Sequence, residues 1–113
     1  MPKKPSQVLR ETTMTQIRGH LWGLDATRAC VLGVLAIEAL EKRPDYTSLT
    51  RQVMDDLIEV YPALGQMIRH PFYGDGGSRG SIAWVLQDLN DDSNLRLNFD
   101  DLAEWLESLP YDL

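Results

Sequence analysis

The sequence predicts an all-α protein: a single small bundle of about five helices around a buried central helix at about residues 25–43. Apolar residues recur three or four positions apart in several segments, which is the period of an amphipathic helix. The longest apolar run, residues 29–37, is typical of a helix that is buried on most sides. Strand-like alternation occurs only over residues 94–98. A chain of 113 residues has room for one core, so we expect one helical domain at 6–113 after a flexible arm at 1–5.

The first two helices are predicted from their start and stop signals. Ser6 is a suitable N-cap, and helically spaced apolar residues follow it until Gly23 closes the first helix. The second helix starts at Asp25 or Thr27 and ends before Pro44, because proline cannot continue a helix. Its apolar middle makes it the central helix of the fold.

The third and fourth helices flank a glycine-rich connection. The third, at about 46–61, has an apolar side and a charged side and ends at Pro62. A short turn and a loop with four glycines follow. Ser81 then caps the fourth helix, whose apolar positions lie within 82–89.

The fifth helix has the clearest N-terminal signal. Asn98 and Asp101 stand three positions apart, the spacing of a capping box, with Asp in place of the usual Glu or Gln. Apolar residues continue the pattern, and Pro110 ends the helix.

The negative charge is concentrated in the C-terminal segment. From Asp88 onward the chain has eight Asp and Glu residues and one base, Arg96, which gives this segment a net charge of −7. The whole chain has a net charge of −6, so the residues before Asp88 carry a net charge of +1. Direct nucleic-acid binding is not expected, because it requires basic residues that displace counterions from phosphates. A protein partner with a basic surface is expected instead. The candidate partner-binding residues are Asp91, Asp92, Asp100, Asp101, Glu104 and Trp105.

An alternative function is a small-molecule or anion-binding module built on the loop from Gly74 to Ser81. This loop leads into a helix N-terminus, where backbone N–H groups can bind an anion. It lacks the Lys-Ser/Thr end of a phosphate-binding loop, so a flexible connector is the competing interpretation. The candidate anion-binding residues are Gly76, Gly77, Arg79 and Ser81.

A third hypothesis is an enzyme that uses Cys30 or Asp91. A nucleophilic cysteine requires a lowered pKa and a nearby base. Cys30 stands inside the apolar run, and neither His20 nor His70 has a recognisable catalytic context. We therefore expect Cys30 to be buried in the central helix and unreactive, and we expect no catalytic residue and no cofactor.

Metal binding is not expected either. One cysteine and two distant histidines do not supply the four clustered ligands of a zinc site. Residues 90–101 carry oxygen ligands at several positions of an EF-hand loop, but Leu95 stands where the turn needs glycine and Asp101 where the loop needs a bidentate glutamate. A polar loop followed by a capped helix accounts for this segment.

The sequence also predicts a cytoplasmic protein that does not contact membranes. No apolar run approaches the roughly 20 residues of a membrane span, and no apolar signal core follows Lys3 and Lys4. A lone cysteine is typical of a reducing compartment. A homo-oligomer is compatible with these observations.

Short segments in a fixed order resemble an uncharacterised family of short helical proteins of bacteria and their phages. They are an opening helix at 8–11, a Trp-Gly element at 22–23, a Cys-x-Leu-Gly element at 30–33, an Asn-Asp pair at 90–91 and a final helix that begins at Phe99. The resemblance implies a helical fold and a bacterial or phage cytoplasmic origin. It implies no activity.

The leading functional hypothesis is a non-enzymatic interaction or regulatory protein that presents its acidic C-terminal face to a protein partner. In a phage setting it would be an inhibitor of a host complex that handles nucleic acid. The charge asymmetry favours this hypothesis over the anion-binding module and the enzyme.

Overall fold

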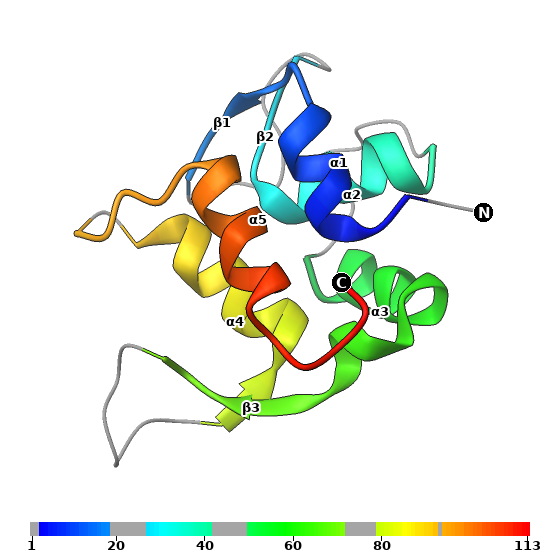
Figure 1. The fold of residues 1–113 in the computed structure, drawn as a ribbon. Helices are drawn as coiled ribbons and strands as arrows, with labels where there is room; N and C mark the ends of the chain where they lie inside the picture. The colour runs from blue at the N-terminus through cyan, green and yellow to red at the C-terminus, as the bar shows by residue number, and fades with distance from the viewer. Residues whose placement is uncertain (1–2, 19–26, 42–49, 72–78, 93) are drawn as a thin grey trace.

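The computed structural model describes residues 3–18, 27–41, 50–71, 79–92 and 94–113. These residues form a mostly helical protein with two small two-stranded sheets, so the predicted all-α class is wrong in excluding strands (Figure 1). The helices are α1 (Pro5–Glu11), α2 (Val31–Ala39), α3 (Thr50–Val60), the short 3-10 helix η1 (Pro62–Gly65), α4 (Ile82–Asp91) and α5 (Phe99–Glu107). The strands are β1 (Thr15–Gln16), β2 (Arg28–Ala29), β3 (Met67–Arg69) and β4 (Arg79–Ser81).

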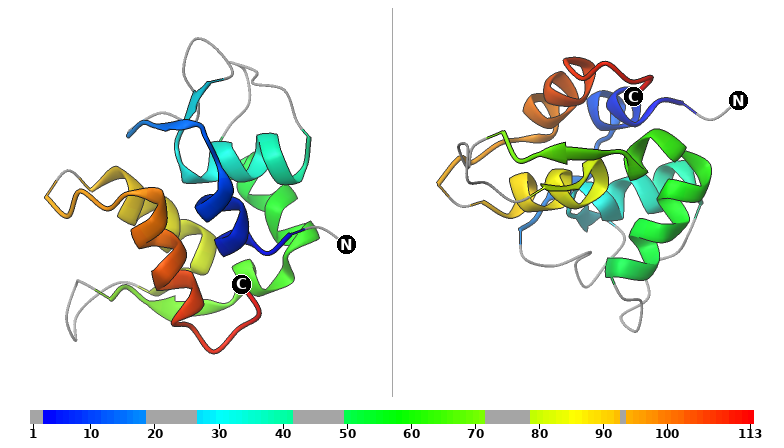
Figure 2. Two further views of the ribbon diagram at one scale, coloured as in Figure 1. Left: turned by 45° about the horizontal axis from the view of Figure 1, so that its top comes forward. Right: turned by 90° about the horizontal axis from the view of Figure 1, so that it is seen from below.

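The helices pack in layers around α2. Helices α1 and α5 lie side by side and cover α2 and α4, while α3 packs on another side of α2 (Figure 2). The radius of gyration is 13.0 Å, as expected for a compact chain of about this length. Among the helices described, none is both long and apolar enough to cross a membrane.

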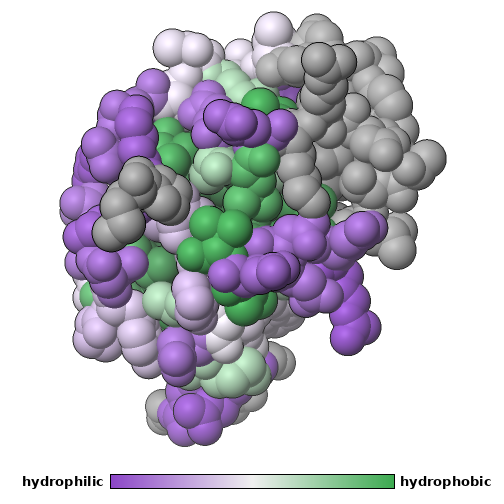
Figure 3. All heavy atoms as spheres, turned by 90° about the vertical axis from the view of Figure 1, so that its right-hand side faces the viewer, coloured by the Kyte–Doolittle hydropathy of each residue, from purple (hydrophilic) through white to green (hydrophobic). Residues whose placement is uncertain are grey.

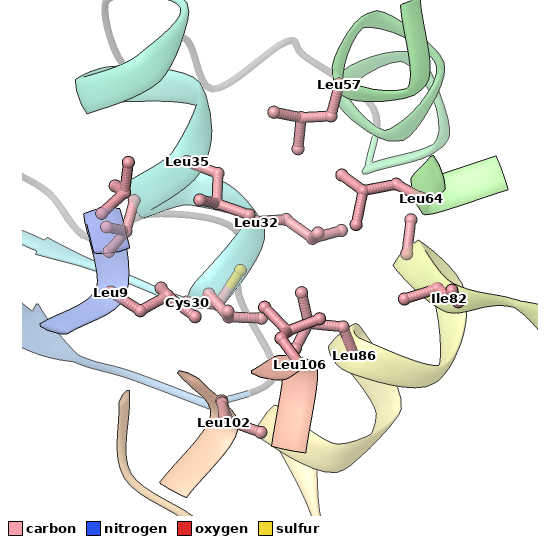
Figure 4. Close-up of a cluster of buried hydrophobic side chains, with 14 of the residues drawn as sticks. Leu9, Cys30, Leu32, Leu35, Leu57, Leu64, Ile82, Leu86, Leu102 and Leu106 are labelled. Carbon is pink, nitrogen blue, oxygen red and sulfur yellow. The ribbon is translucent and has the colours of Figure 1, made fainter. Parts of the chain in front are cut away.

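The predicted buried central helix is confirmed as α2. Every residue from Val31 to Ala36 is buried, so this helix has no solvent-facing side over that stretch. Leucine and isoleucine side chains from each of the other helices converge on it (Figure 4). They surround Leu32 and Leu35 of α2 itself and are Leu9, Leu57, Leu64, Ile82, Leu86, Leu102 and Leu106.

The central helix is shorter than the predicted span of 25–43. Residues 25–26 and 42–43 lie outside the described ranges, but Arg28–Ala29 forms β2, which pairs in parallel with β1. Cys30 has an extended backbone (φ −75°, ψ 177°) and is the N-cap of α2 rather than an interior residue. At the other end Glu41 has a φ of 55°, in the left-handed region, so the helix cannot continue through it.

The first helix also differs from its prediction. It begins at Pro5, one residue before the expected cap Ser6, and ends at Glu11 instead of continuing to Gly23. The Thr12 hydroxyl accepts a hydrogen bond from the Met14 N–H at 3.1 Å, a local bond that competes with helix formation. The chain then enters β1, which hydrogen-bonds with the segment before α2.

Residues 3–5, expected to belong to a flexible arm, are held by contacts with distant parts of the chain. The Tyr61 hydroxyl donates to the Lys3 carbonyl at 2.6 Å, and the Lys4 ammonium pairs with Asp112. Pro5 is buried as the first residue of α1. The C-terminal residue Leu113 is buried as well, and its carbonyl accepts the Ser6 N–H at 2.9 Å.

The three later helices agree more closely with the sequence. Helix α3 lies within the predicted 46–61, of which 46–49 are outside the described residues. The predicted Ser81 cap of α4 is confirmed, because its hydroxyl accepts the Trp84 N–H at 3.2 Å. The predicted capping box of Asn98 and Asp101 opens α5.

The β3–β4 ribbon packs closely against α4 at Gly80. A Cβ atom on Gly80 would overlap Cε3 of the Trp84 ring, at a separation that Cβ atoms do not show in real proteins. The Trp84 ring in turn packs edge-on against His70, with 6.4 Å between ring centroids. Nε2 of His70 lies 2.7 Å from a carboxylate oxygen of Asp88 on the same helix as Trp84. Gly80 thus allows the ribbon to lie against the first turn of α4.

We predict that Gly80→Ala destabilises the protein by about 1–3 kcal/mol, the usual range for overpacking, because the Trp84 ring must move. Urea denaturation measures the change in unfolding free energy. In a Trp84→Ala background the same substitution should cost much less, since the two effects are coupled. Equal costs in both backgrounds would contradict the assigned contact.

Candidate functional site

Helix α5 separates an apolar side from an acidic one. The capping box is reciprocal: Oδ1 of Asn98 accepts the Asp101 N–H at 2.8 Å, and Oδ2 of Asp101 accepts the Asn98 N–H at 3.0 Å. Asp100, Asp101 and Glu104 are exposed, and the Trp105 side chain is half-buried. We call these four residues the α5 face. The opposite side of the helix enters the core through Phe99, Leu102, Ala103 and Leu106.

An open groove of about 330 Å³ runs along the α5 face. Residues 101, 104, 105 and 108 are three or four positions apart, so they share one side of the helix. Leu97 joins them from the turn that precedes α5, and both Leu97 and Trp105 pack against the core. The groove therefore combines apolar and carboxylate walls. It is lined by Leu97, Asp101, Glu104, Trp105 and Ser108.

The other two candidate acids lie at the end of α4 and are engaged locally. The Asp91 carboxylate accepts hydrogen bonds from the Gln87 amide at 2.9 Å and from the Asn90 amide at 3.0 Å. Oδ1 of Asp92 accepts two backbone N–H groups of the following turn, at 2.9 and 3.1 Å. Asp91 is thus engaged within α4 and Asp92 within the turn that follows it, whereas the Asp100 and Glu104 side chains of the α5 face have no hydrogen-bond partner among the described residues.

The candidate anion site is only partly described. Gly76 and Gly77 lie outside the described residues. Arg79 is exposed on β4, directly opposite Arg69 on β3. Like charges in opposing positions of a ribbon repel each other.

The start of α4 has few donors left for an anion. The Trp84 N–H is bonded to the Ser81 hydroxyl at 3.2 Å, and the Ile82 N–H is bonded to the Gln66 carbonyl at 3.0 Å. An anion would have to displace these partners, because binding at a helix N-terminus uses these same N–H groups.

Cys30 is buried, as predicted. Its side chain is fully inaccessible, and its thiol donates to the Gln87 amide oxygen at 3.3 Å. Burial raises the pKa of the Cys30 thiol to about 11, and the nearby Asp91 carboxylate adds to this. The backbone N–H groups of Leu32 and Gly33 at the helix start oppose the shift but do not cancel it. A thiol with this pKa is almost entirely protonated at neutral pH and is a poor nucleophile.

A buried amide, Asn90, connects the elements around Cys30. Its Oδ1 accepts from the Val31 N–H at 3.1 Å and from the Gln16 amide at 2.9 Å. Its Nδ2 donates to the Ile17 carbonyl and to the Asp91 carboxylate, both at 3.0 Å. All four hydrogen-bonding positions of the amide are therefore occupied. Asn90 joins β1, α2 and α4 and has no capacity left for a ligand.

The structure gives no support to a metal site at 90–101. Asn90 is engaged as above, the Asp92 carboxylate closes a turn, and Asp101 belongs to the capping box. In the described part of the chain, no three His, Cys, Asp or Glu side chains are arranged to hold a metal ion.

Exposed apolar side chains alone do not single out a binding surface. Figure 3 shows an apolar patch bordered by polar side chains on the right-hand side of the molecule in Figure 1. Exposed apolar surface is ordinary in folded proteins, because polar groups cannot cover the whole surface. The large apolar residues that are exposed in the described ranges come from separate elements: Val60, Met67, Trp84 and Tyr111. The α5 groove differs because its apolar walls adjoin carboxylates.

Two groove residues were not among the sequence candidates. Ser108 could have been found, since it stands seven positions after Asp101 and so faces the same side of a helix. Leu97 could not, because it lies outside the helix and is placed by contacts with β1 and its flank: its carbonyl accepts from the Gln16 amide at 2.9 Å and from the Arg18 guanidinium at 3.0 Å.

Comparison with protein-family models, curated protein sequences and solved structures finds no match to this chain. The similarity to the bacterial and phage family therefore stays an expectation. Its Trp-Gly element at 22–23 lies outside the described residues. Cys30, Asn90 and Asp91 are connected, together with Gln87, by hydrogen bonds in one partly buried cluster.

We predict that Asn90→Ala destabilises the protein by about 3 kcal/mol or more, because it leaves buried donors and acceptors without partners. Urea denaturation of the variant and of Asn94→Ala provides the comparison. Asn94 is exposed, so its replacement should change the unfolding free energy by no more than about 0.5 kcal/mol. Similar stabilities of the two variants would contradict the role assigned to Asn90.

We also predict that Cys30 resists modification in the native protein. A small thiol reagent added near pH 8 should react far more slowly with the folded chain than with the chain in denaturant, because the thiol is inaccessible and protonated. Mass spectrometry follows the adduct. Modification at the unfolded rate would show that Cys30 is accessible.

Proposed function

We propose that this protein is a non-enzymatic interaction protein that presents the α5 face to a protein partner with a basic surface. The observation that carries the proposal is the arrangement on α5, where three exposed carboxylates and a half-buried tryptophan share one side of a helix beside a groove. Aromatic side chains at the centre of a binding surface supply contact area, and surrounding charges select the partner.

The carboxylates of the α5 face are not neutralised within the described chain. No Lys or Arg there forms an ion pair with Asp100, Asp101 or Glu104. Three other exposed acids do have cationic partners: Glu107 with Arg10 at 2.6 Å, Asp112 with Lys4 at 2.6 Å and Glu11 with Lys3 at 2.8 Å. The α5 face thus carries three uncompensated carboxylates beside a tryptophan, and this charge can attract a basic partner.

An acidic surface of this kind would compete with nucleic acid for a basic protein. Carboxylates cannot reproduce the charge density of a phosphate backbone, but they attract the same Lys and Arg residues. We therefore also propose, as the biological setting, a cytoplasmic phage or bacterial regulator that inhibits a host nucleic-acid-handling complex. Electrostatic steering would make its association fast and salt-dependent.

The alternative functions have weaker support. An anion-binding module would need the α4 start, where the Ile82 and Trp84 N–H groups already have partners. An enzyme based on Cys30 would need an accessible thiolate, whereas this thiol is buried with a pKa of about 11. An enzyme based on Asp91 would use a carboxylate that two side-chain amides already engage.

We predict that the double variant Asp100→Asn, Glu104→Gln captures its partner about fivefold more weakly, since exposed charge pairs contribute about 0.2–1 kcal/mol each. The immobilised chain is exposed to a bacterial extract across a salt series, and retained proteins are quantified by mass spectrometry. Retained proteins should be basic, and the variant should show a smaller loss of capture as salt rises.

The matched control is Asp55→Asn, Glu59→Gln on α3. It removes the same two charges at the same four-residue spacing from another exposed helix face. Capture by this control should resemble that of the parent. If the two double variants behave alike, the α5 face is not the interaction surface.

A further inference from the structure

The groove on α5 is suited to a single long cationic side chain. At about 330 Å³ it is at the small end of ligand-sized pockets and is too small for a folded element. One wall is the half-buried Trp105, and the neighbouring walls include the carboxylates of Asp101 and Glu104. An apolar stem can lie against Leu97 and Trp105 while a charged end meets the carboxylates.

We propose that this groove receives one arginine side chain of the partner, an inference that rests on the function proposed above. The guanidinium is planar, so it can stack on the Trp105 ring and still direct its N–H groups sideways. Asp101 and Glu104 are three positions apart on the same side of α5 and accept these N–H groups. An arginine therefore uses the aromatic wall and the acidic wall together.

Lysine fits the same groove less completely. Its ammonium is a compact, strongly hydrated charge that cannot stack as a plane, so it contacts either the ring or the carboxylates well. The selectivity expected of the groove is thus arginine over lysine, and lysine over an uncharged isostere. This order separates a shaped groove from a merely acidic surface, which would bind both cations alike.

Glu104 is the residue whose substitution tests the groove most directly. Asp101 also accepts the Asn98 N–H in the capping box, so its replacement affects the helix start. The Glu104 carboxylate has no hydrogen-bond or ion-pair partner among the described residues, and the residue is exposed. Glu104→Gln removes the charge and keeps the length of the side chain. Asp100→Asn is the matched control, because Asp100 is exposed on the same helix but does not line the groove.

The test is a titration of the full chain with three blocked tripeptides, Gly-Arg-Gly, Gly-Lys-Gly and Gly-citrulline-Gly, followed by NMR. The Trp105 indole N–H signal is assigned from a Trp105→Phe variant. We expect a saturable shift with the arginine peptide, affinity at least about threefold lower for lysine, and none for citrulline. Glu104→Gln should weaken arginine binding by about five- to tenfold, and Asp100→Asn by less than about twofold.

The outcomes distinguish the groove from the wider α5 face. Equal weakening by Glu104→Gln and Asp100→Asn, or equal binding of arginine and lysine, overturns the groove inference and leaves the proposed function standing. An arginine peptide that gives no saturable shift at Trp105 also overturns it. Partner capture by the α5 and α3 double variants decides the proposed function separately, because that experiment does not depend on which cation binds.

Discussion

The hydrogen bonds of one buried amide determine how β1, α2 and α4 meet. Asn90 is fully buried on α4, and its side chain bonds to Gln16, Ile17, Val31 and Asp91. A buried amide with missing partners is costly, so the arrangement is favourable only when β1, α2 and α4 all lie in place together. Apolar contacts elsewhere are compatible with small shifts between helices. The hydrogen bonds of the Asn90 amide are not compatible with such shifts, because its donors and acceptors are directional. It therefore selects one packing among the many that the leucine-rich core would allow.

The hydrogen bonds of Asn90 are also connected to the candidate site on α5. The Gln16 amide donates both to Asn90 and to the Leu97 carbonyl, so the turn that forms one wall of the α5 groove is tied to the buried amide. The Val31 N–H bond caps α2 from another helix, and it places Cys30 at the helix start, where Gln87 accepts its thiol proton. One network thus connects the buried cysteine with one wall of the surface groove. A change at position 90 should therefore alter both regions, although neither the thiol nor the groove contacts the other.

Features that depend on residues close together in the sequence, such as helix caps, agree with the sequence predictions. Features that depend on residues far apart in the sequence do not. The Ser81 cap and the Asn98–Asp101 capping box involve residues three positions apart, so their chemistry is visible in a short stretch of sequence. The start of α2 is fixed by an amide 59 residues away, and β1 is paired with a strand on the far side of residues 19–26. Periodicity within 25–43 could not reveal either, because an apolar run suits a buried strand and a buried helix alike. At the candidate site, the sequence pattern indicates Asp101, Glu104 and Trp105 but not Leu97, whose position depends on hydrogen bonds from Gln16 and Arg18.

The three acidic residues of the α5 face differ in how much they contribute to the stability of the folded chain. Asp100 and Asp101 stand in the first turn, where carboxylates are stabilised by the helix dipole, and Asp101 also completes the capping box. Glu104 lies beyond the first turn, where the dipole effect has faded, and no cation of the described chain offsets its charge. The next acid along the helix, Glu107, is paired with Arg10. The Glu104 carboxylate therefore gains nothing from the helix dipole or from a cation in the described part of the chain, yet it stands beside Trp105 in the groove. A charge without a role in folding, placed against a half-buried aromatic ring, is the combination that a basic partner would explain.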